Sequence, residues 1–417
     1  MHAAAQDEAH DEFFPLVPAP QDGSRWQAPT DLEQYLYKLS RADNAYAYLR
    51  TLAIEGVYYP VRLDQAQAAG EDEHPMLTIE TPDGHTAAQV YTPGLLPRPH
   101  PFLVYEYATL GALAQIVPED VGVLAVNAAT PCEQYFLISD DEREVWLDLH
   151  HELFSSDALM DRVTTRRTGA PAPGPLLHGL ACGAHLCYAN GDAWNTLHWH
   201  GMGYRGEVER IADSWGVHGR EDWLSVQERL LDREVSPWYW DFVLGARTAL
   251  ARARGGRVDP GEWRDTVETT LRVRAQESGN AGDGDAEFAG FVAHLRALVG
   301  EVLRYEARFR ADGLLPPDGF VDTIAAWDIG RASKMARWGR GARYATEAEM
   351  HAAIERASGE ARAAYDSWEE FSAGYVLGRC LHFDEEEFGP WYTTVLDAHL
   401  ALTTDPESPW RTVPFKD

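Results

Sequence analysis

Two aromatic segments in the last third of the chain constrain its fold more than any other feature. Residues 327–338 begin with Trp-Asp-Ile-Gly-Arg, and residues 367–379 begin with Ser-Trp-Glu-Glu-Phe. The second segment repeats large side chains at steps of three and four residues, at Trp368, Phe371, Tyr375 and Arg379. Such spacing is typical of one helix face. The chain is therefore expected to contain two amphipathic helices whose aromatic faces pack in a core, with arginines on or near those faces.

The boundaries and internal pairing of these helices follow from smaller signals. Ser367 and Glu370 have the spacing of a capping box, in which the serine oxygen accepts a backbone N–H of the first turn. In the first segment Asp328 stands three residues before Arg331, a separation at which the two side chains meet on a helix surface. We expect Asp328 and Arg331 to form an ion pair.

Chain length and composition favour two globular domains. The chain has 417 residues, whereas single hydrophobic cores stop growing at roughly 250–300 residues. Hydrophobic residues make up 45% of the chain, enough to bury a core in each domain. With 66 acidic and 36 basic residues, the net charge of −30 opposes binding to nucleic acid or to anionic membranes.

The compartment is inferred from what the sequence lacks. Four cysteines give no disulfide framework of the kind found in small secreted domains. The first residues are acidic and carry neither the basic nor the apolar region of a signal peptide, and no apolar run reaches the ~18 residues of a membrane span. These patterns predict a cytoplasmic protein that does not enter membranes.

The first half of the chain has the pattern of a small α/β domain. Residues 1–25 form an acidic leader that we expect to be flexible, and the domain is predicted to occupy residues 26–154. A helical pattern comes first, and short runs rich in β-branched and aromatic residues follow at 57–61, 76–79, 87–92, 102–105 and 121–127. This order predicts a mixed sheet with helices.

Several short motifs in this half resemble one known family. They are Pro60-Val61, Asp83-Gly84, Val90-Tyr91-Thr92, Val117-Pro118 and the strand-like run at 122–127. Together they resemble the N-terminal domain of the SseB, or enhanced-serine-sensitivity, family. The resemblance implies a small α/β module with no established active site, and hence a binding role for this half.

The second half is predicted to be mostly helical. Residues 155–177 include a Pro/Gly-rich run that is typical of a linker. A helical domain is expected over 178–417, with a flexible loop near 275–286. The fold class is therefore α+β, with a small N-terminal α/β domain followed by a larger, mostly helical domain.

The two aromatic helices and the motifs around them resemble an uncharacterised bacterial family, domain of unknown function 1266. Residues 180–183 (Leu-Ala-Cys-Gly) and 213–217 (Asp-Ser-Trp-Gly-Val) resemble the beginning of the family sequence. Residues 404–410 resemble its C-terminal part. The resemblance spans roughly 180–410. A long segment near 250–315 departs from the usual pattern of the family.

The candidate site residues come from these two helices. Asp328 and Glu369 are candidate acids or bases, and the candidate binding residues are Arg331, Arg379, Arg337, Trp327, Trp368 and Tyr375. Arginine forks bind carboxylate or phosphate, so Asp328, Arg331, Glu369 and Arg379 could line a buried polar pocket. The alternative is a structural ion-pair network that holds two helices in register.

Two further motifs suggest ligands only weakly. His178, Cys182 and His185 have helical spacing and could be drawn as a zinc site, but they lack paired Cys-x-x-Cys geometry. Residues 201–206 match Gly-x-Gly-x-x-Gly, yet no returning parallel strand is indicated after them. We therefore expect no metal and no cofactor.

Two functions remain open from the sequence. The first is a cytoplasmic, non-enzymatic module that binds another protein, for example an immunity or accessory factor in a bacterial toxin, secretion or competition system. The second is a hydrolase or toxin-like effector that uses the Asp328, Arg331, Glu369 and Arg379 cluster. A protein partner is expected in the first case, and the sequence does not indicate an oligomeric state.

Overall fold

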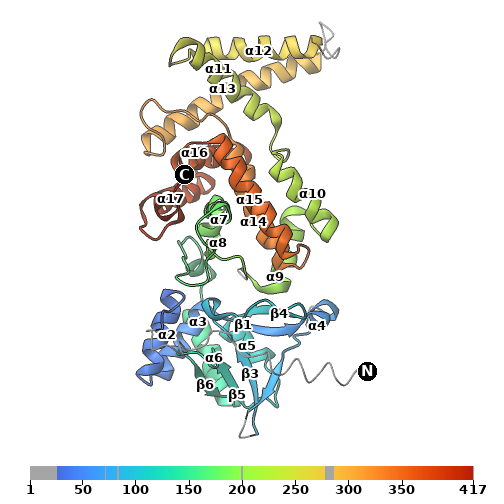
Figure 1. Ribbon diagram of the computed structural model, residues 1–417, viewed down its shortest axis with the longest axis vertical. Coiled ribbons are helices and arrows are strands. Elements are labelled where there is room, and N and C mark those ends of the chain that lie inside the picture. The colour runs from blue at the N-terminus through green and yellow to red at the C-terminus, as the bar shows by residue number, and fades with distance from the viewer. Residues whose placement is uncertain (1–25, 71, 82–83, 199–200, 278–285, 417) are drawn as a thin grey trace. The chain divides into compact units, whose positions relative to one another are not determined.

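The computed structural model describes residues 26–416 except 71, 82–83, 199–200 and 278–285. The expected leader (1–25) and most of the expected loop near 275–286 therefore lie outside the described residues. The chain divides into two compact units (Figure 1). The first unit consists of Met1–Ala172, Asn190–Trp223 and Arg337–Glu347, and the second of Pro173–Ala189, Leu224–Ala336 and Ala348–Asp417.

The first unit contains two sheets. Its strands are β1 (Val57–Arg62), β2 (Thr78–Glu80), β3 (Thr86–Val90), β4 (Leu103–Ala108), β5 (Val123–Val126) and β6 (Gln134–Leu137). Strands β1 and β4 pair in antiparallel register, with Val57 opposite Ala108. The other sheet has the order β2-β3-β5-β6, in which β3 and β5 are parallel and the remaining pairs antiparallel. The expected mixed sheet is thus confirmed.

Helices cover this unit and complete its core. They are α2 (Asp31–Arg41), α3 (Ala45–Glu55), α4 (Leu63–Ala68), α5 (Leu110–Ile116), α6 (Asp140–Leu153) and α9 (Gly203–Trp215), with 3₁₀ turns at Pro93–Leu95 and Ser156–Leu159. Trp146 of α6 and Tyr48 of α3 are fully buried among apolar residues of the strands. Burying a large apolar side chain stabilises a fold by about 1.5–3 kcal/mol, so these rings anchor the helices to the sheets.

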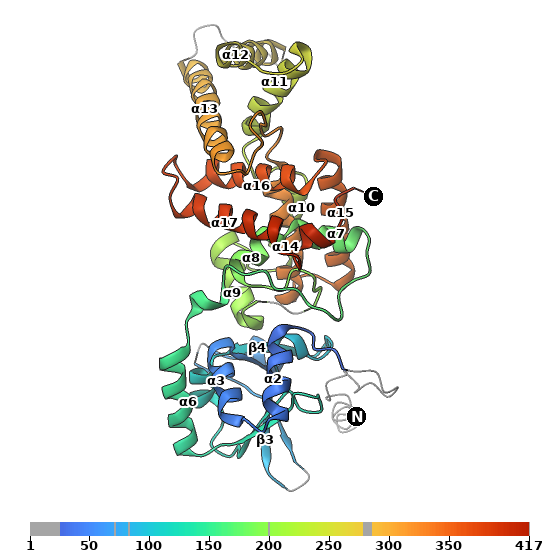
Figure 2. The ribbon, with the colours of Figure 1, turned by 90° about the vertical axis from the view of Figure 1, so that its left-hand side faces the viewer.

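The second unit is helical. Its helices include α7 (Pro175–Cys182), α8 (Ala184–Asn190), α11 (Trp238–Arg254), α12 (Pro260–Glu277), α13 (Ala286–Ala311), α15 (Glu347–Ala364), α16 (Trp368–Phe383), α17 (Pro390–Thr404) and α18 (Pro409–Thr412). Two further helices, α10 (Arg220–Leu231) and α14 (Ala325–Gly341), contribute residues to both units. Helices α12 and α13 lie side by side, as do α16 and α17 (Figure 2). The expected α+β fold, with a larger helical part after a small sheet region, is confirmed.

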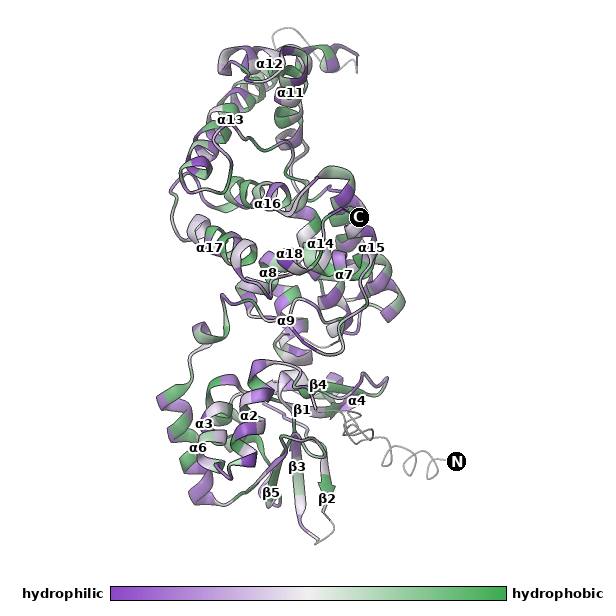
Figure 3. Ribbon diagram, turned by 60° about the vertical axis from the view of Figure 1, so that its left-hand side comes forward, coloured by the Kyte–Doolittle hydropathy of each residue, from purple (hydrophilic) through white to green (hydrophobic). Residues whose placement is uncertain are grey.

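The aromatic helices begin and pack as their sequences indicate. The Ser367 hydroxyl accepts the Glu370 backbone N–H at 3.1 Å, and α16 begins at the next residue, Trp368. Gly378 of α16 faces Trp327 of α14 so closely that a Cβ there would lie 2.5 Å from the tryptophan Cβ. Glycine therefore permits the contact between these helices. Hydrophobic residues cluster along parts of α16, whereas polar and apolar residues alternate along α12 (Figure 3).

Candidate functional site

The carboxylate of Asp328 lies in the interior of the helical unit with both oxygens occupied. Its Oδ1 accepts the Ser236 hydroxyl at 2.7 Å, and its Oδ2 accepts the Ser236 backbone N–H at 3.1 Å. Oδ1 also forms an ion pair with Arg331, one turn along α14. The side chain is 1% exposed. This carboxylate is thus enclosed and hydrogen-bonded on both oxygens.

Arg331 is held on the other side of the same network. Its Nε donates to the Trp327 carbonyl oxygen at 3.0 Å, and its Nη2 lies 3.3 Å from the Ser236 hydroxyl oxygen. The guanidinium stacks on the Trp327 ring at 4.2 Å from the centroid. Burial lowers the pKa of Arg331, while the Asp328 charge opposes that shift. The expected Asp328–Arg331 pair is therefore present, and it is a closed network that fixes α14 against the chain segment before α11.

The other two members of the expected cluster lie elsewhere. Glu369 is exposed in the first turn of α16 and, within the described part of the chain, forms no ion pair with Arg331 or Arg379. Arg379 is half-buried near the end of α16, where its guanidinium lies over the Trp391 and Phe383 rings at 5.2 and 5.7 Å from their centroids. The structure therefore brings Asp328 and Arg331 together and leaves Glu369 and Arg379 outside their network.

The remaining candidates line the aromatic interior or belong to the first unit. Trp368 stacks on Trp410 at 5.8 Å, and its indole N–H donates to the Val413 carbonyl oxygen at 2.8 Å. Tyr375 is buried edge-on to Trp327 at 4.9 Å, and burial raises its pKa to about 12. Arg337 belongs to the first unit, where it donates to the Ala193 carbonyl oxygen at 2.6 Å.

The three candidate metal ligands are buried and contact different parts of the core. His178 Nδ1 lies 3.0 Å from the Ser358 hydroxyl, Cys182 Sγ lies 3.4 Å from the His178 carbonyl oxygen, and the His185 ring stacks on Tyr375 at 4.2 Å. Among the described residues no three histidine, cysteine or carboxylate groups are placed to hold a metal ion together.

A buried His-Ser-His arrangement escaped sequence reasoning. The Ser372 hydroxyl lies 3.0 Å from His185 Nε2 and 2.8 Å from His399 Nδ1. One hydroxyl can donate to one imidazole and accept from the other when both rings are neutral. No local sequence signal links these three residues, because they come from α8, α16 and α17, far apart along the chain.

The environment keeps these histidines neutral. Burial lowers the pKa of His185 well below its ordinary value, and the neighbouring His399 and Arg379 side chains act in the same direction. Burial lowers the pKa of His399 to about 4, although the Glu369 charge opposes the shift. A serine beside a neutral histidine has the distances of an activated nucleophile. Ser372 is fully buried, however, and no substrate could reach it. We therefore interpret the arrangement as structural, with the Ser372 hydroxyl providing hydrogen-bond partners for the two buried imidazoles.

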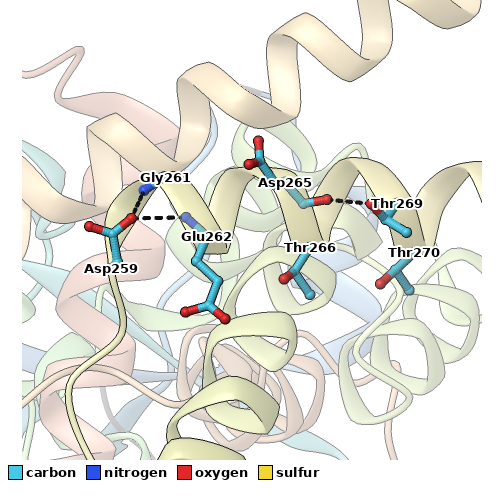
Figure 4. A pocket seen from close by; sticks show the side chains of 7 residues that line it. All are labelled: Asp259, Gly261, Glu262, Asp265, Thr266, Thr269 and Thr270. Carbon is cyan, nitrogen blue, oxygen red and sulfur yellow. Dashed lines mark hydrogen bonds between the residues drawn. The ribbon is translucent and has the colours of Figure 1, made fainter.

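A depression on the surface of α12 is lined by a single element. Its residues are Asp259, Gly261, Glu262, Asp265, Thr266, Thr269 and Thr270 (Figure 4). The Asp259 carboxylate accepts the backbone N–H groups of Gly261 and Glu262, as at a helix start, and the Thr269 hydroxyl donates to the Asp265 carbonyl oxygen. Because its walls come from one helix and the residue that precedes it, the depression is open and does not enclose a ligand.

Comparison with known proteins identifies part of the helical region. Residues 210–415 match the family described as "Protein of unknown function (DUF1266)". The chain therefore carries a DUF1266 domain. One similar relative is "Uncharacterized protein YbeR" of Escherichia coli (strain K12), which is 27% identical over 169 residues. The alignment covers 40% of this chain and 55% of the relative, so the chain spans about half the length of the curated relative it matches.

The match to DUF1266 includes α14 and α16, whose motifs carried the resemblance in the sequence. No solved structure matches the chain. Among the described residues, no helix combines the length and the apolar character needed to cross a lipid bilayer.

Proposed function

We propose that this protein is a cytoplasmic, non-enzymatic interaction module that binds another protein through its DUF1266 domain. The observation that carries the proposal is the exposure of tryptophans on that domain: Trp238 is 57% and Trp391 47% exposed. Large aromatic side chains supply most of the binding energy at protein interfaces, and their exposure is informative where isolated small apolar residues are not.

The closed state of the polar cluster adds to this argument. Both oxygens of Asp328 are bonded inside the fold, and Glu369 is exposed and forms no ion pair with an arginine of the described residues. The alternative function, a hydrolase or toxin-like effector built on these residues, would need an accessible carboxylate positioned by the arginines. The geometry gives that alternative no such group at Asp328.

The proposed context is bacterial competition or secretion, with the protein acting as an immunity or accessory factor. The first unit is proposed to be SseB-like and to bind as well, because it combines a small mixed sheet with helices, as that resemblance implies. A net charge of −30 makes nucleic acid an unfavourable partner and favours protein surfaces that are less acidic.

The test is affinity purification of the tagged protein from its own host, followed by reconstitution with the purified partner. We expect one stoichiometric protein partner whose complex survives size-exclusion chromatography. Leu400→Ala, at an exposed apolar residue of the DUF1266 match other than the two tryptophans, is the control for nonspecific apolar capture through the helical unit. A retained small molecule without a protein partner, or toxicity on expression, would instead favour the enzyme.

A further inference from the structure

Arg379, Phe383 and Trp391 form a small surface at the junction of α16 and α17, here called the Arg379 surface. The Phe383 and Trp391 rings stack with centroids 4.8 Å apart and an interplanar angle of 18°. The guanidinium of Arg379 lies over both rings. Phe383 and Trp391 are both exposed, so the surface presents two aromatic rings and a cation to the exterior of the unit.

The cation on this surface has no carboxylate counterpart. Within the described part of the chain, Arg379 forms no ion pair, and its Nε is buried without an acceptor. Other arginines of the helical unit do have acidic partners: Arg247 binds Glu306, Arg296 binds Asp265 and Glu268, Arg304 binds Glu386, and Arg356 binds Glu228 and Asp232. Arg379 differs from these arginines in that it lies beside two exposed aromatic rings and has no acidic partner among the described residues.

The acidic residues nearest in sequence are directed to other partners. Asp384 accepts the Tyr305 hydroxyl at 3.1 Å, and Glu386 is bound by Arg304 at 2.7 Å. Glu385 and Glu387 are exposed, and neither forms an ion pair with Arg379. The guanidinium therefore keeps donors for a carboxylate that comes from outside the chain.

We propose that the Arg379 surface is the docking site for a segment of a partner protein that presents one carboxylate beside an apolar side chain. An arginine fork matches the two oxygens of a carboxylate, and the stacked rings match an aliphatic or aromatic neighbour. Phosphorylated or nucleic-acid ligands are recognised by clusters of cations, and this surface offers a single arginine. This inference rests on the proposed function and assigns it a place and a partner chemistry.

The experiment is selection of short random peptides displayed on phage against the whole protein. Enriched peptides are expected to carry Asp or Glu next to a large apolar residue. Synthetic versions of them should bind Arg379→Ala and Trp391→Ala about ten-fold or more weakly, as expected for residues that anchor an interface. Arg379→Lys should bind with intermediate affinity, because it keeps the charge and loses the fork.

The control variant for Trp391→Ala is Leu400→Ala, which alters another exposed apolar residue of α17, 42% exposed, and should bind like the unmodified protein. Trp238→Ala, at another exposed tryptophan of the unit, tests whether the peptides dock on α11 instead. Thermal unfolding of every variant separates lost binding from lost folding.

The outcomes separate this inference from the proposed function. Enriched peptides without acidic residues, peptides that bind Arg379→Ala undiminished, or no enrichment at all would each overturn the Arg379 surface. If Trp238→Ala instead abolishes binding of the natural partner, the interaction module stands and its surface lies on α11. If the affinity purification also yields no protein partner, the proposed function fails as well.

Discussion

Arg331 and Arg379 lie on packed helices and both stack on a tryptophan, yet they differ in what neutralises them. Arg331, inside the unit, is matched by Asp328 and Ser236, and its donors are directed at groups of the same chain. Arg379, near the end of α16, has aromatic rings beside it and, among the described residues, no carboxylate in an ion pair with it. An arginine stacked on a tryptophan is therefore part of a structural network at Arg331, whereas at Arg379 the missing counter-ion is the basis for the binding role that we propose.

The largest effect is expected from removing the carboxylate inside the network. Asp328→Ala should lower the free energy of unfolding by about 3–5 kcal/mol, because Arg331 then remains buried without its partner. Urea titration measures the loss. Asp397→Ala, at an exposed aspartate of α17, is the control and should change stability by about 0.5 kcal/mol or less. A small loss in Asp328→Ala would mean that the network does not hold the fold.

Acid should weaken the same interior through its histidines. An unfolded histidine titrates near pH 6.5, whereas the pKa of folded His399 is about 4. Because the unfolded chain binds the proton first, this contribution to stability is present above about pH 6.5 and is lost as the pH falls towards 4. The expected loss is about 3 kcal/mol.

The histidine prediction is checked by unfolding His399→Gln and His218→Gln across this pH range. His399→Gln should flatten the dependence of stability on pH, whereas His218→Gln, at an exposed residue, should leave it unchanged. Arg379→Ala should retain most of the dependence of stability on pH, because burial is the main cause of the lowered pKa of both histidines. Identical slopes in His399→Gln and the unmodified protein would exclude the buried imidazole as the source.

The close approach of α14 and α16 gives a third, smaller effect. In Gly378→Ala the new methyl group would lie within 2.5 Å of Trp327, so the helices must separate, at a cost of about 1–3 kcal/mol. Gly359→Ala in α15 meets no atom within 4 Å and should be neutral or stabilising, because alanine favours a helix. Equal melting temperatures for the two variants would contradict the tight contact.

The smallest effect on stability is expected at the Arg379 surface. Arg379→Ala loses two contacts with aromatic rings at a partly exposed position, which are together worth about 1 kcal/mol. Thermal unfolding of Arg379→Ala beside Asp328→Ala tests the contrast directly. A loss as large as that of Asp328→Ala would make Arg379 a structural residue and would remove the reason for assigning it to binding.

Local sequence patterns predicted most helices and strands, but they did not predict contacts between residues far apart along the chain. The Ser367 cap, the buried stripe of Trp368, Phe371 and Tyr375, and the Asp328–Arg331 pair depend on residues a few positions apart, where helix geometry fixes the neighbours. Most strands were also indicated by β-branched runs. Strand β6 was not, because its burial alternates over only four residues.

The candidate site was less predictable because its partners are far apart along the chain. Ser236, which occupies both oxygens of Asp328, lies 92 residues before it, and the three residues of the His-Ser-His arrangement come from three helices. Helical spacing also placed Glu369 and Arg379 in one cluster with Asp328. Helical spacing does not say whether a side chain in the first turn of a helix faces the core or the solvent. In the structure the Glu369 side chain is exposed.

The interleaved course of the chain limits how this protein can be cut. Residues 190–223 and 337–347 flank most of the helical unit in sequence yet pack with the first unit, where the Tyr58 hydroxyl donates to the Gly201 carbonyl oxygen at 2.5 Å and Arg343 donates to the His100 carbonyl oxygen at 3.0 Å. A fragment limited to the DUF1266 match, residues 210–415, would leave 337–347 and the retained part of 190–223 without the rest of the first unit. Expression of the DUF1266 domain alone should therefore yield an aggregation-prone, protease-sensitive product. Recombinant work is best done on the whole chain.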